Sequence, residues 1–430
     1  MTIHTPSVPT RPLLLRHARL LDPESGESEG SVLVADGRIQ ALGADAEGER
    51  AGSRVIDARG LILAPGIIDT ASWAIDPQAA LAGGITTVLL MPDAVSPVID
   101  HAAMVALLAN SHRSAGPRVH PVGALSRGLA GEALAELGLM AEAGAIAFSD
   151  GCRPVRSAQL MRRALTYARR FGRPVVSLPL EPDLATGGVM HEGETAAILG
   201  LPGIPAEAEC IQIERDARLA RLAGEPLHLF PLTTAEGVRA LTRLQEEGAP
   251  VTAGTSPAYF HLNDMAVGAY RSFARLHPPL RSEDDRLAVQ AAVADGSIAV
   301  IASAHTPLGE DDKRLPFEEA APGAIGYETL LPLSLALMRD GLLDLTGLWR
   351  RLTTHPARIF GLEPPRLVVG APADLVLFDP DEPWRVDAAS LVAETDNTPF
   401  DGLPVTGRTV LTMVGGIVQF DRRGLAAPKG

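Results

Sequence analysis

Cysteine, aromatic residues and long apolar runs are all scarce in this sequence. Its 430 residues include only two cysteines, Cys152 and Cys210, and 4% are aromatic. Two cysteines without CxxC spacing form neither a disulfide framework nor a zinc motif. No stretch approaches the roughly 20 uninterrupted apolar residues of a membrane span. The short N-terminal run 13–15 is followed at once by Arg16, which argues against a secretory signal. We therefore expect a cytoplasmic protein with reduced thiols.

The sequence also lacks an excess of positive charge. Its net charge is -14, whereas a phosphate-binding surface is basic, so nucleic acid is not the expected partner. Hydrophobic residues make up 46% and charged residues 21%, which predicts a large packed core.

Local catalytic motifs are missing as well. The eleven histidines are scattered, with no HxH, no HExxH and no pair spaced i, i+4. There is no GxSxG nucleophile motif and no GxxxxGK[ST] phosphate loop. Any active site must therefore be assembled from residues far apart in the chain.

Both ends of the chain read as short strands. Asp36-Gly37 separates two apolar runs in 31–43, which is typical of a two-residue hairpin, and a second strand pair is expected around Arg59-Gly60. Further β-rich runs occupy 373–380, 408–416 and 417–423. We expect residues 1–63 and 363–430 to build one small β-sandwich together.

The middle of the chain alternates between apolar runs and helical patterns. Eight such runs predict an α/β protein, a (β/α)8 TIM barrel over 64–362. The runs are 66–70, 84–91, 118–125, 145–150, 174–180, 226–232, 250–255 and 298–304, and helices are expected over 130–144, 158–172 and 234–248.

Functional residues of such barrels lie just after the strands. A catalytic zinc needs three protein ligands of the His, Asp, Glu or Cys type. Only Asp150, Glu181 and His305 stand at suitable positions, and no local motif reinforces them. Scaffolding roles are the better interpretation: Asp150 precedes a glycine, as in Asx turns, and an isolated histidine is more often hydrogen-bonded structure.

Long motifs now indicate a family. The sequence resembles the dihydroorotases of the amidohydrolase superfamily, the bacterial class related to allantoinases and hydantoinases. The resemblance covers nearly the whole chain and is carried by GGVMHEGETAAILGLPGIPAEAE (187–209), HPPLRSEDDR (277–286), PFEEAAPGAIGYETLLPLSL (316–335), THPARIFGL (354–362) and GAPADLVLFDP (370–380).

The departures from the family pattern fall at its catalytic positions. The resemblance implies metal-ligand histidines where this chain has Ala71, Trp73, Leu178 and Pro231, and a catalytic aspartate where it has Ala304. The substrate-contacting asparagine corresponds to His277, and the arginine that binds the substrate carboxylate corresponds to Ile75. Two family residues are kept: the bridging acid Asp150, and His305, which matches the histidine that follows the catalytic aspartate.

These departures predict a non-catalytic dihydroorotase homologue of pyrimidine biosynthesis that has lost the family zinc, with no other cofactor, no metal residues and no catalytic residues. Without metal, water keeps a pKa near 15.7 instead of about 7. The resemblance implies a structural subunit that associates with the catalytic subunit of aspartate carbamoyltransferase, in a homo- or hetero-oligomer.

Two alternatives remain open at this point. One is an active cyclic-amide hydrolase with a rebuilt site, metal-containing or metal-free, that uses Asp150, Glu181, His277 and His305. The other is a small-molecule binding or sensing module that uses the emptied pocket.

Overall fold

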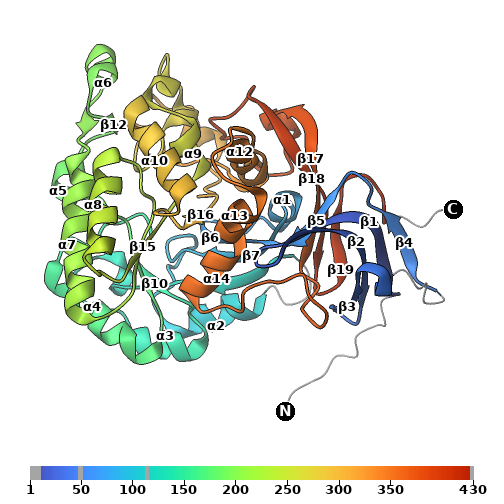
Figure 1. Ribbon diagram of the computed structural model, residues 1–430. Helices are drawn as coiled ribbons and strands as arrows, with labels where there is room; N and C mark the ends of the chain where they lie inside the picture. The colour runs from blue at the N-terminus through green and yellow to red at the C-terminus, as the bar shows by residue number, and fades with distance from the viewer. Residues whose placement is uncertain (1–10, 47–51, 112–115, 427–430) are drawn as a thin grey trace.

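A computed structural model describes residues 11–46, 52–111 and 116–426. The chain forms a barrel surrounded by helices and, beside it, a sheet to which both ends of the chain contribute (Figure 1).

The barrel has eight parallel strand positions, and each predicted run supplies one. β6 pairs with β7 and β7 with β8, and a second set runs β9, β10, β11, β14, β15, β16. A backbone bond from Trp73 to His305 (N···O 2.8 Å) closes the ring between the first and eighth positions. The strands are β6 (Ile67–Ser72), β7 (Ile85–Leu90), β8 (Arg118–Pro121) continued by β9 (Gly123–Ala124), β10 (Phe148–Ser149), β11 (Val175–Ser177), β14 (Leu227–Leu229), β15 (Val251–Thr255) and β16 (Val300–Ile301).

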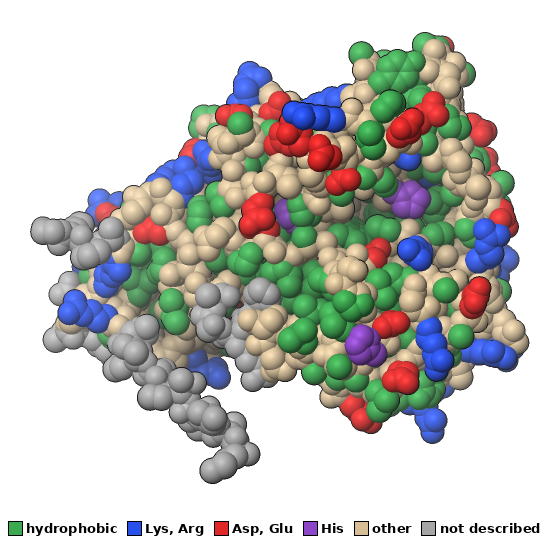
Figure 2. Space-filling view, turned by 180° about the vertical axis from the view of Figure 1, so that it is seen from behind, with side chains coloured by type: hydrophobic (Ala, Val, Ile, Leu, Met, Phe, Trp, Pro, Cys, Tyr) green, Lys and Arg blue, Asp and Glu red, His purple; other side chains and the backbone are tan. Residues whose placement is uncertain are grey.

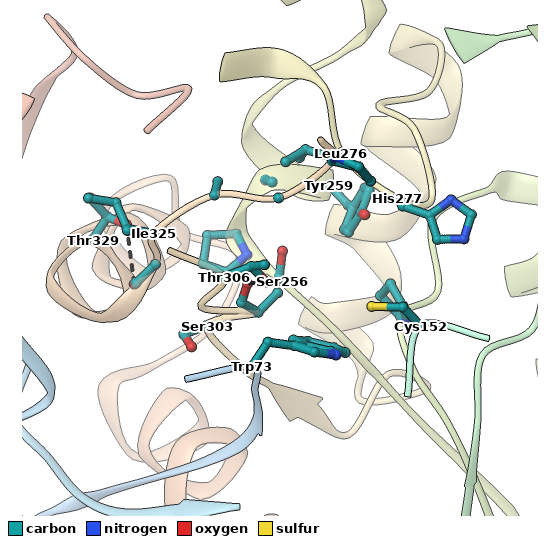
Figure 3. A pocket seen from close by; sticks show the side chains of 18 of the residues that line it. Trp73, Cys152, Ser256, Tyr259, Leu276, His277, Ser303, Thr306, Ile325 and Thr329 are labelled. Atoms are coloured by element: carbon teal, nitrogen blue, oxygen red, sulfur yellow. Dashed lines mark hydrogen bonds between the residues drawn. The ribbon is translucent and has the colours of Figure 1, made fainter. Parts of the chain in front are cut away.

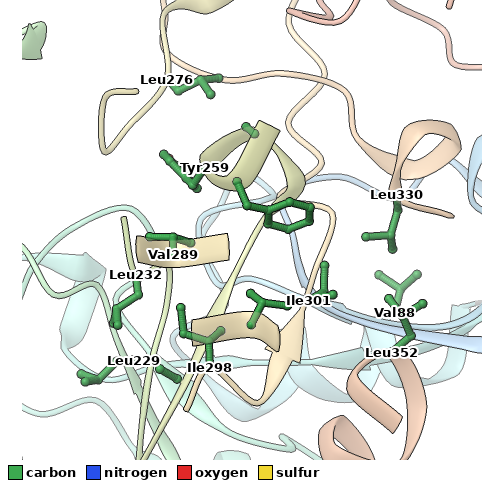
Figure 4. Packing of buried hydrophobic residues seen from close by; sticks show 14 of the residues in the cluster. Val88, Leu229, Leu232, Tyr259, Leu276, Val289, Ile298, Ile301, Leu330 and Leu352 are labelled. Carbon is green, nitrogen blue, oxygen red and sulfur yellow. The ribbon is translucent and has the colours of Figure 1, made fainter. Parts of the chain in front are cut away.

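Barrel strands are covered on both faces, which explains their continuous apolar runs. All residues of β6 and β7 are buried. Figure 4 shows part of the main cluster, to which Ile298 and Ile301 of the eighth unit belong together with Val289, Tyr259 and Leu330. The expected TIM barrel is confirmed.

Helices surround the barrel, and one of them, α6 (Glu194–Leu199), projects away from it (Figure 1). They are α1 (Pro77–Ala82), α2 (Ala102–Ser111), α3 (Leu137–Ala143), α4 (Ala158–Ala168), α5 (Pro182–Ala185), α6 (Glu194–Leu199), α7 (Glu207–Ala223), α8 (Ala235–Glu246), α9 (Pro257–His261), α10 (Glu283–Asp295), α11 (Glu310–Lys313), α12 (Tyr327–Arg339), α13 (Leu345–Trp349) and α14 (His355–Phe360), with a π-helical segment Arg350–Thr354 between the last two. The short strands β12 (Met190–His191) and β13 (Gly203–Ile204) flank α6.

One helix is shorter than the sequence predicts. The pattern over 130–144 predicts a single helix, but α3 begins only at Leu137. Gly131 has φ +69°, a left-handed conformation that a continuous right-handed helix cannot contain. The first half of this stretch is therefore irregular, with an isolated bridge between Leu134 and Ser126.

The terminal sheet joins the two ends of the chain. Its strand order is β19-β18-β17-β5-β1-β2-β3, with β4 also on β1. The strands are β1 (Leu13–Asp22), β2 (Gly26–Ala35), β3 (Arg38–Leu42), β4 (Arg54–Asp57), β5 (Ile62–Pro65), β17 (Leu375–Arg385), β18 (Pro404–Val414) and β19 (Ile417–Asp421). Val32 of the N-terminal half and Met413 of the C-terminal half belong to the same hydrophobic cluster. The β-rich unit built from both termini is confirmed.

Of the two hairpins that the sequence predicts in this sheet, one forms and the other does not. Asp36 and Gly37 have φ values of 52° and 75°, the two positive angles of a type I′ hairpin, as the sequence predicts. The segments around Arg59-Gly60 do not pair with each other, because β4 and β5 both lie parallel to β1. The predicted domain boundary at 63/64 falls inside β5, and the boundary at 362/363 follows α14; as domain limits, both stay predictions.

Trp349 links the two parts of the molecule. Its ring stacks on Phe378 of β17 at 5.0 Å between centroids, and its Nε1–H donates to the Pro65 carbonyl at 2.9 Å. Acidic and basic side chains are interspersed over the face in Figure 2. No helix in the described part of the chain is both long and apolar enough to cross a membrane.

Candidate functional site

The carboxyl ends of the barrel strands carry apolar side chains where the family pattern has metal ligands. Ala71 of β6 is 2% exposed and belongs to a hydrophobic cluster with Phe230. Trp73, just after β6, and Ala304, just after β16, pack against this same cluster. Alanine and tryptophan side chains offer no lone pair that a metal ion accepts, so these three positions supply no ligand.

The backbone at the eighth strand end keeps an unusual conformation. Ala304 has φ +53°, a left-handed value that is uncommon outside glycine, asparagine and aspartate. The adjacent Ser303 donates its backbone N–H and its hydroxyl to Asp69, at 2.7 and 2.6 Å. Burial raises the pKa of Asp69 to about 6, although these hydrogen bonds oppose the shift. Asp69 therefore connects the first strand to the eighth.

His305 is part of the scaffold between the barrel and α12. Its ring is fully buried and stacks on Tyr327, with centroids 3.7 Å apart. Its Nδ1 accepts a hydrogen bond from the Gly326 backbone N–H at 3.2 Å. Burial lowers the pKa of His305 to about 3, so the ring is neutral near pH 7.

The two candidate carboxylates are engaged in local hydrogen bonds. Asp150 accepts the Ser126 hydroxyl at 2.6 Å and the backbone N–H groups of Ser126 and Leu125 at 2.8 and 3.1 Å. Burial is the largest effect on the pKa of Asp150 and raises it. Glu181 caps α5 by accepting the Leu184 backbone N–H at 2.8 Å. Both arrangements are typical of structural carboxylates.

The remaining predicted positions lie in different surroundings. Leu178 packs with Leu180 and Ile204 in a small cluster of its own. Pro231 and His277 line a pocket at the barrel mouth. Burial, followed by nearby arginines, lowers the pKa of His277 to about 4, so its ring is also neutral near pH 7.

The structure thus brings together Trp73, Pro231, His277 and Ala304 around one pocket, but not Asp150, Glu181 or His305. Within residues 11–46, 52–111 and 116–426, no three His, Cys, Asp or Glu side chains are grouped so that they could hold a metal ion.

The pocket has a volume of about 90 Å³ and opens at the carboxyl end of the barrel. In Figure 3 the Trp73 ring lies along one side, Thr306 and Ser256 stand above it in the view, and Leu276, Tyr259 and His277 lie at the far side. It is lined by Trp73, Cys152, Phe230, Pro231, Ser256, Pro257, Ala258, Tyr259, Leu276, His277, Ser303, Ala304, Thr306, Pro322, Gly323, Ala324, Ile325, Gly326, Thr329 and Phe400.

Two residues at the mouth were not singled out as functional by sequence reasoning. Asp93, at the end of the second strand, accepts the Cys152 backbone N–H at 2.9 Å, and burial raises its pKa. Tyr327 covers His305, and its hydroxyl lies 2.5 Å from Ser72 Oγ. The sequence signal for Asp93 was its position just after an apolar run. Tyr327 had no such signal, because it comes from a helix distant in the sequence.

The family-like motifs hold the fold together instead. Glu209 is fully buried and accepts the backbone N–H groups of Thr233 and Thr234 at 3.0 Å. Arg281, 2% exposed, donates to Thr233 Oγ1 at 3.1 Å and to the Ile204 carbonyl at 2.9 Å. The stretches 187–209 and 277–286 therefore meet in one buried polar network.

Comparisons with known proteins agree with this architecture. A family model described as "Dihydro-orotase-like" matches residues 64–237. A dihydroorotase of Pelobacter propionicus is 41% identical, covering 95% of this chain and all of that protein. A dihydroorotase of Desulforapulum autotrophicum is 40% identical over 94% of this chain and 98% of its own length. The solved structure of L-hydantoinase (dihydropyrimidinase) from Arthrobacter aurescens superposes with a TM-score of 0.84 at 26% identity, covering 95% of this chain and 96% of that chain.

Fold and sequence together define an amidohydrolase-superfamily barrel with a terminal β-rich unit. The extent and identity of the matches place it more narrowly. The chain belongs to the dihydroorotase family.

Proposed function

We propose that this chain is a dihydroorotase homologue that binds no catalytic metal and does not hydrolyse dihydroorotate. The observation that carries the proposal is the chemistry of the strand ends. Ala71, Trp73 and Ala304 pack in or against one hydrophobic cluster at the place where the family pattern has ligands and a catalytic acid. The residues present do not fit a zinc ion.

The energetic consequence of these replacements is large. Catalytic zinc sites use three protein ligands, and zinc lowers the pKa of its water to about 7. The buried Asp150 already accepts three hydrogen bonds, so binding a metal there would first require breaking them. An alanine at position 304 also removes a general base, an effect of roughly 10²–10⁴-fold in rate.

We further propose a structural role, in the cytoplasm, as an assembly partner of the aspartate carbamoyltransferase catalytic subunit. Two features support it: the family fold and its buried network are intact, and the groups for chemistry are replaced. Co-expression and co-purification with that subunit test it. We expect a stable complex and higher transferase activity when this chain is present; a transferase that never binds the chain contradicts the role.

A cyclic-amide hydrolase is the second candidate, and a specific observation favours it. Relatives with 38–41% identity over at least 94% of this chain are named dihydroorotase. Such an enzyme would need Asp150, Glu181, His277 and His305 to act together, and in this structure only His277 faces the pocket.

One experiment separates the two candidates. The purified full chain is analysed for bound metal and assayed for dihydroorotate hydrolysis, before and after incubation with zinc. We expect no stoichiometric metal and no turnover above the background. Asp150→Asn serves as a control, because it alters the retained acid: turnover that depends on Asp150 identifies an active enzyme and overturns the proposal.

A further inference from the structure

Two neighbouring helices on the outside of the barrel carry charges of opposite sign. Residues 128–152, which contain α3, include acidic residues but no Lys or Arg. Residues 151–180, which contain α4, include seven arginines but no Asp or Glu. Negative and positive charge are therefore separated onto α3 and α4, although the whole chain has a net charge of -14.

The exposed charges of these two helices are unpaired. Glu136 and Glu142 of α3 and Arg162, Arg163 and Arg170 of α4 are all exposed. None of these five side chains makes an ion pair or a hydrogen bond within residues 11–46, 52–111 and 116–426. They are therefore available to another molecule.

Several arginines elsewhere on the barrel surface are paired within their own helix. Arg286 lies 2.6 Å from Glu283 in α10, and Arg243 lies 2.6 Å from Glu247 at the end of α8. Residues three or four positions apart are neighbours on a helix surface, which allows such pairs. α4 contains no acidic residue that could serve its arginines in this way.

α3 carries an acidic stripe with an apolar centre. Glu136, Leu139 and Glu142 follow one another at intervals of three residues, so they share one side of the helix. All three are exposed, and Leu139 is 53% exposed. The two glutamates are separated by about 9 Å along the helix axis.

α4 carries a basic stripe of similar length. Arg163, Tyr167 and Arg170 are spaced by four and three residues, so they also share one side, with Arg170 in the 3-10 turn that continues the helix. Tyr167 at the centre is 38% exposed. The two arginines are separated by about 11 Å along the axis. The spacing of the positive charges therefore matches that of the negative charges to about 2 Å, which long arginine side chains can accommodate.

The two stripes lie beside each other because α3 and α4 pack closely (Figure 1). A Cβ added to Gly138 of α3 would come within 2.9 Å of the Phe171 ring and 3.2 Å of the Tyr167 hydroxyl. Tyr167 in turn meets Phe171 edge to face, with centroids 5.4 Å apart. The absence of a side chain at Gly138 thus brings the apolar centres of the two stripes together on one surface.

We propose that the two stripes form a dimer interface with a second copy of this chain, related by a two-fold axis between α3 and α4. Successive helices of such a barrel run in the same direction, so the axis sets α3 of one copy antiparallel to α4 of the other. Glu136 then faces the partner's Arg170, and Glu142 faces the partner's Arg163. Each contact occurs twice, because a two-fold interface uses the same surface on both copies.

A second copy fits this surface better than a partner with one sign of charge. A nucleic acid or an acidic protein would be attracted by α4 but repelled by α3, whereas a second copy pairs both stripes. The adjacent helix α2 extends the surface, since it has no charged residue and its Leu107 is 62% exposed. Such additional area is needed, because a standard interface buries about 800 Å² on each partner.

Charge reversal on the full chain tests the interface by sedimentation velocity at about 10 µM. Arg163→Glu with Arg170→Glu makes both stripes negative, and Glu136→Arg with Glu142→Arg makes both positive. We expect a wild-type dimer and self-association at least about 100-fold weaker for each reversed chain, because like charges then face each other. A wild type that is monomeric at about 100 µM, or an oligomer that neither reversal weakens, overturns the proposal.

Mixing the two reversed chains tests the two-fold arrangement. The introduced arginines of one chain then face the introduced glutamates of the other, and the natural arginines face the natural glutamates. We expect two monomeric chains to form a one-to-one heterodimer. Both variants keep a net negative charge, since each changes the charge of -14 by four units, so overall charge does not attract them. Two chains that stay separate when mixed overturn the arrangement.

Arg239→Glu with Arg314→Glu is the matched control. It changes the net charge by the same amount as the arginine reversal on α4, at exposed positions in α8 and at the end of α11. We expect it to leave the dimer unchanged, and equal weakening would attribute the effect to net charge and overturn the interface. Thermal unfolding establishes that every variant is folded.

This inference goes beyond the proposed function and fails separately from it. Zinc content and dihydroorotate hydrolysis are measured on the same wild-type preparation. A dimer that hydrolyses dihydroorotate overturns the non-catalytic function alone. A monomer without turnover overturns the dimer interface alone.

Discussion

The imidazole of His305 lies face to face with the phenol ring of Tyr327, with centroids 3.7 Å apart and planes 6° apart. This stack lies beside the strand end where the family pattern places its catalytic aspartate. The His305 ring contacts α12 and is fully buried from solvent.

Stability at acidic pH should report the burial of this ring. The pKa of His305 is lowered from 6.5 to about 3, so the unfolded chain takes up a proton that the folded chain does not. Stability from this group is complete above pH 6.5 and is lost as pH falls toward 3. Between pH 7 and pH 5, wild type should lose about 2 kcal/mol more than His305→Asn. Urea denaturation at both pH values measures this, and equal losses would contradict it.

Other titrating groups contribute equally to wild type and to His305→Asn, so their effects cancel in the difference between the two stabilities. Asp69, whose pKa is raised to about 6, acts in the opposite direction, since its contribution to stability is lost as pH rises through that value. Both proteins contain Asp69, so its effect cancels in the difference.

The buried network of the family-like motifs should be essential for stability. Glu209→Ala removes the carboxylate that contributes most to compensating the charge of Arg281, a side chain that is 2% exposed. Removing one partner of a buried charge network costs about 3–5 kcal/mol. Glu207→Ala, an exposed position in the same helix, should change the unfolding free energy by less than about 0.5 kcal/mol. Similar losses in the two variants would show that the network carries no such energy.

Trp73 should stabilise the barrel mouth by packing. Trp73→Ala should cost about 2–3 kcal/mol, less than the 3–5 of a fully buried aromatic residue because Trp73 is partly exposed. Tyr167→Ala, on α4 and 38% exposed, should cost about 1 kcal/mol. Chemical denaturation measures both; a Trp73 variant as stable as wild type would mean that the ring makes no stabilising contact.

Metal binding should return only when several positions are restored together. A variant with Ala71→His and Trp73→His gains two ligands, but the retained acid Asp150 is held by three hydrogen bonds and does not complete the three that a catalytic zinc needs, so the variant should bind zinc no better than wild type. Stoichiometric zinc should appear in the variant that combines five substitutions: Ala71→His, Trp73→His, Leu178→His, Pro231→His and Ala304→Asp. Zinc per folded chain is measured by elemental analysis, with near-ultraviolet circular dichroism to establish folding. One bound zinc per chain in the variant with only the substitutions at positions 71 and 73 would contradict this expectation.

Strand positions were predictable because apolar runs record burial on both faces. Ala71, Trp73 and Ala304 consequently stand at the barrel mouth, as expected. The partners of side chains were not predictable in the same way. A scaffolding role was the preferred interpretation of His305, but its stacking partner, a residue 22 positions further along the chain, could not be identified from the sequence. The carboxylate of Asp150 accepts a hydrogen bond from the Ser126 hydroxyl. This contact joins two strand ends, and the spacing of the two residues in the sequence does not predict it.

The environment of the Ser256 hydroxyl also lay beyond the sequence. Its position after the seventh strand was evident, but an N-terminal serine of a helix normally caps that helix. Only the structure shows that the hydroxyl of Ser256 makes no capping bond and lines the pocket instead.

The pairing of β5 with β17 has a consequence for the order in which this protein is made. Ile62–Pro65 leaves the ribosome early, but the strand that covers its edge begins only at Leu375. At a synthesis rate of about 5–20 residues per second, that edge waits for tens of seconds. An unpaired strand edge is a template for pairing with other chains. The newly made N-terminal strands are therefore the part of this molecule that most needs protection before synthesis ends.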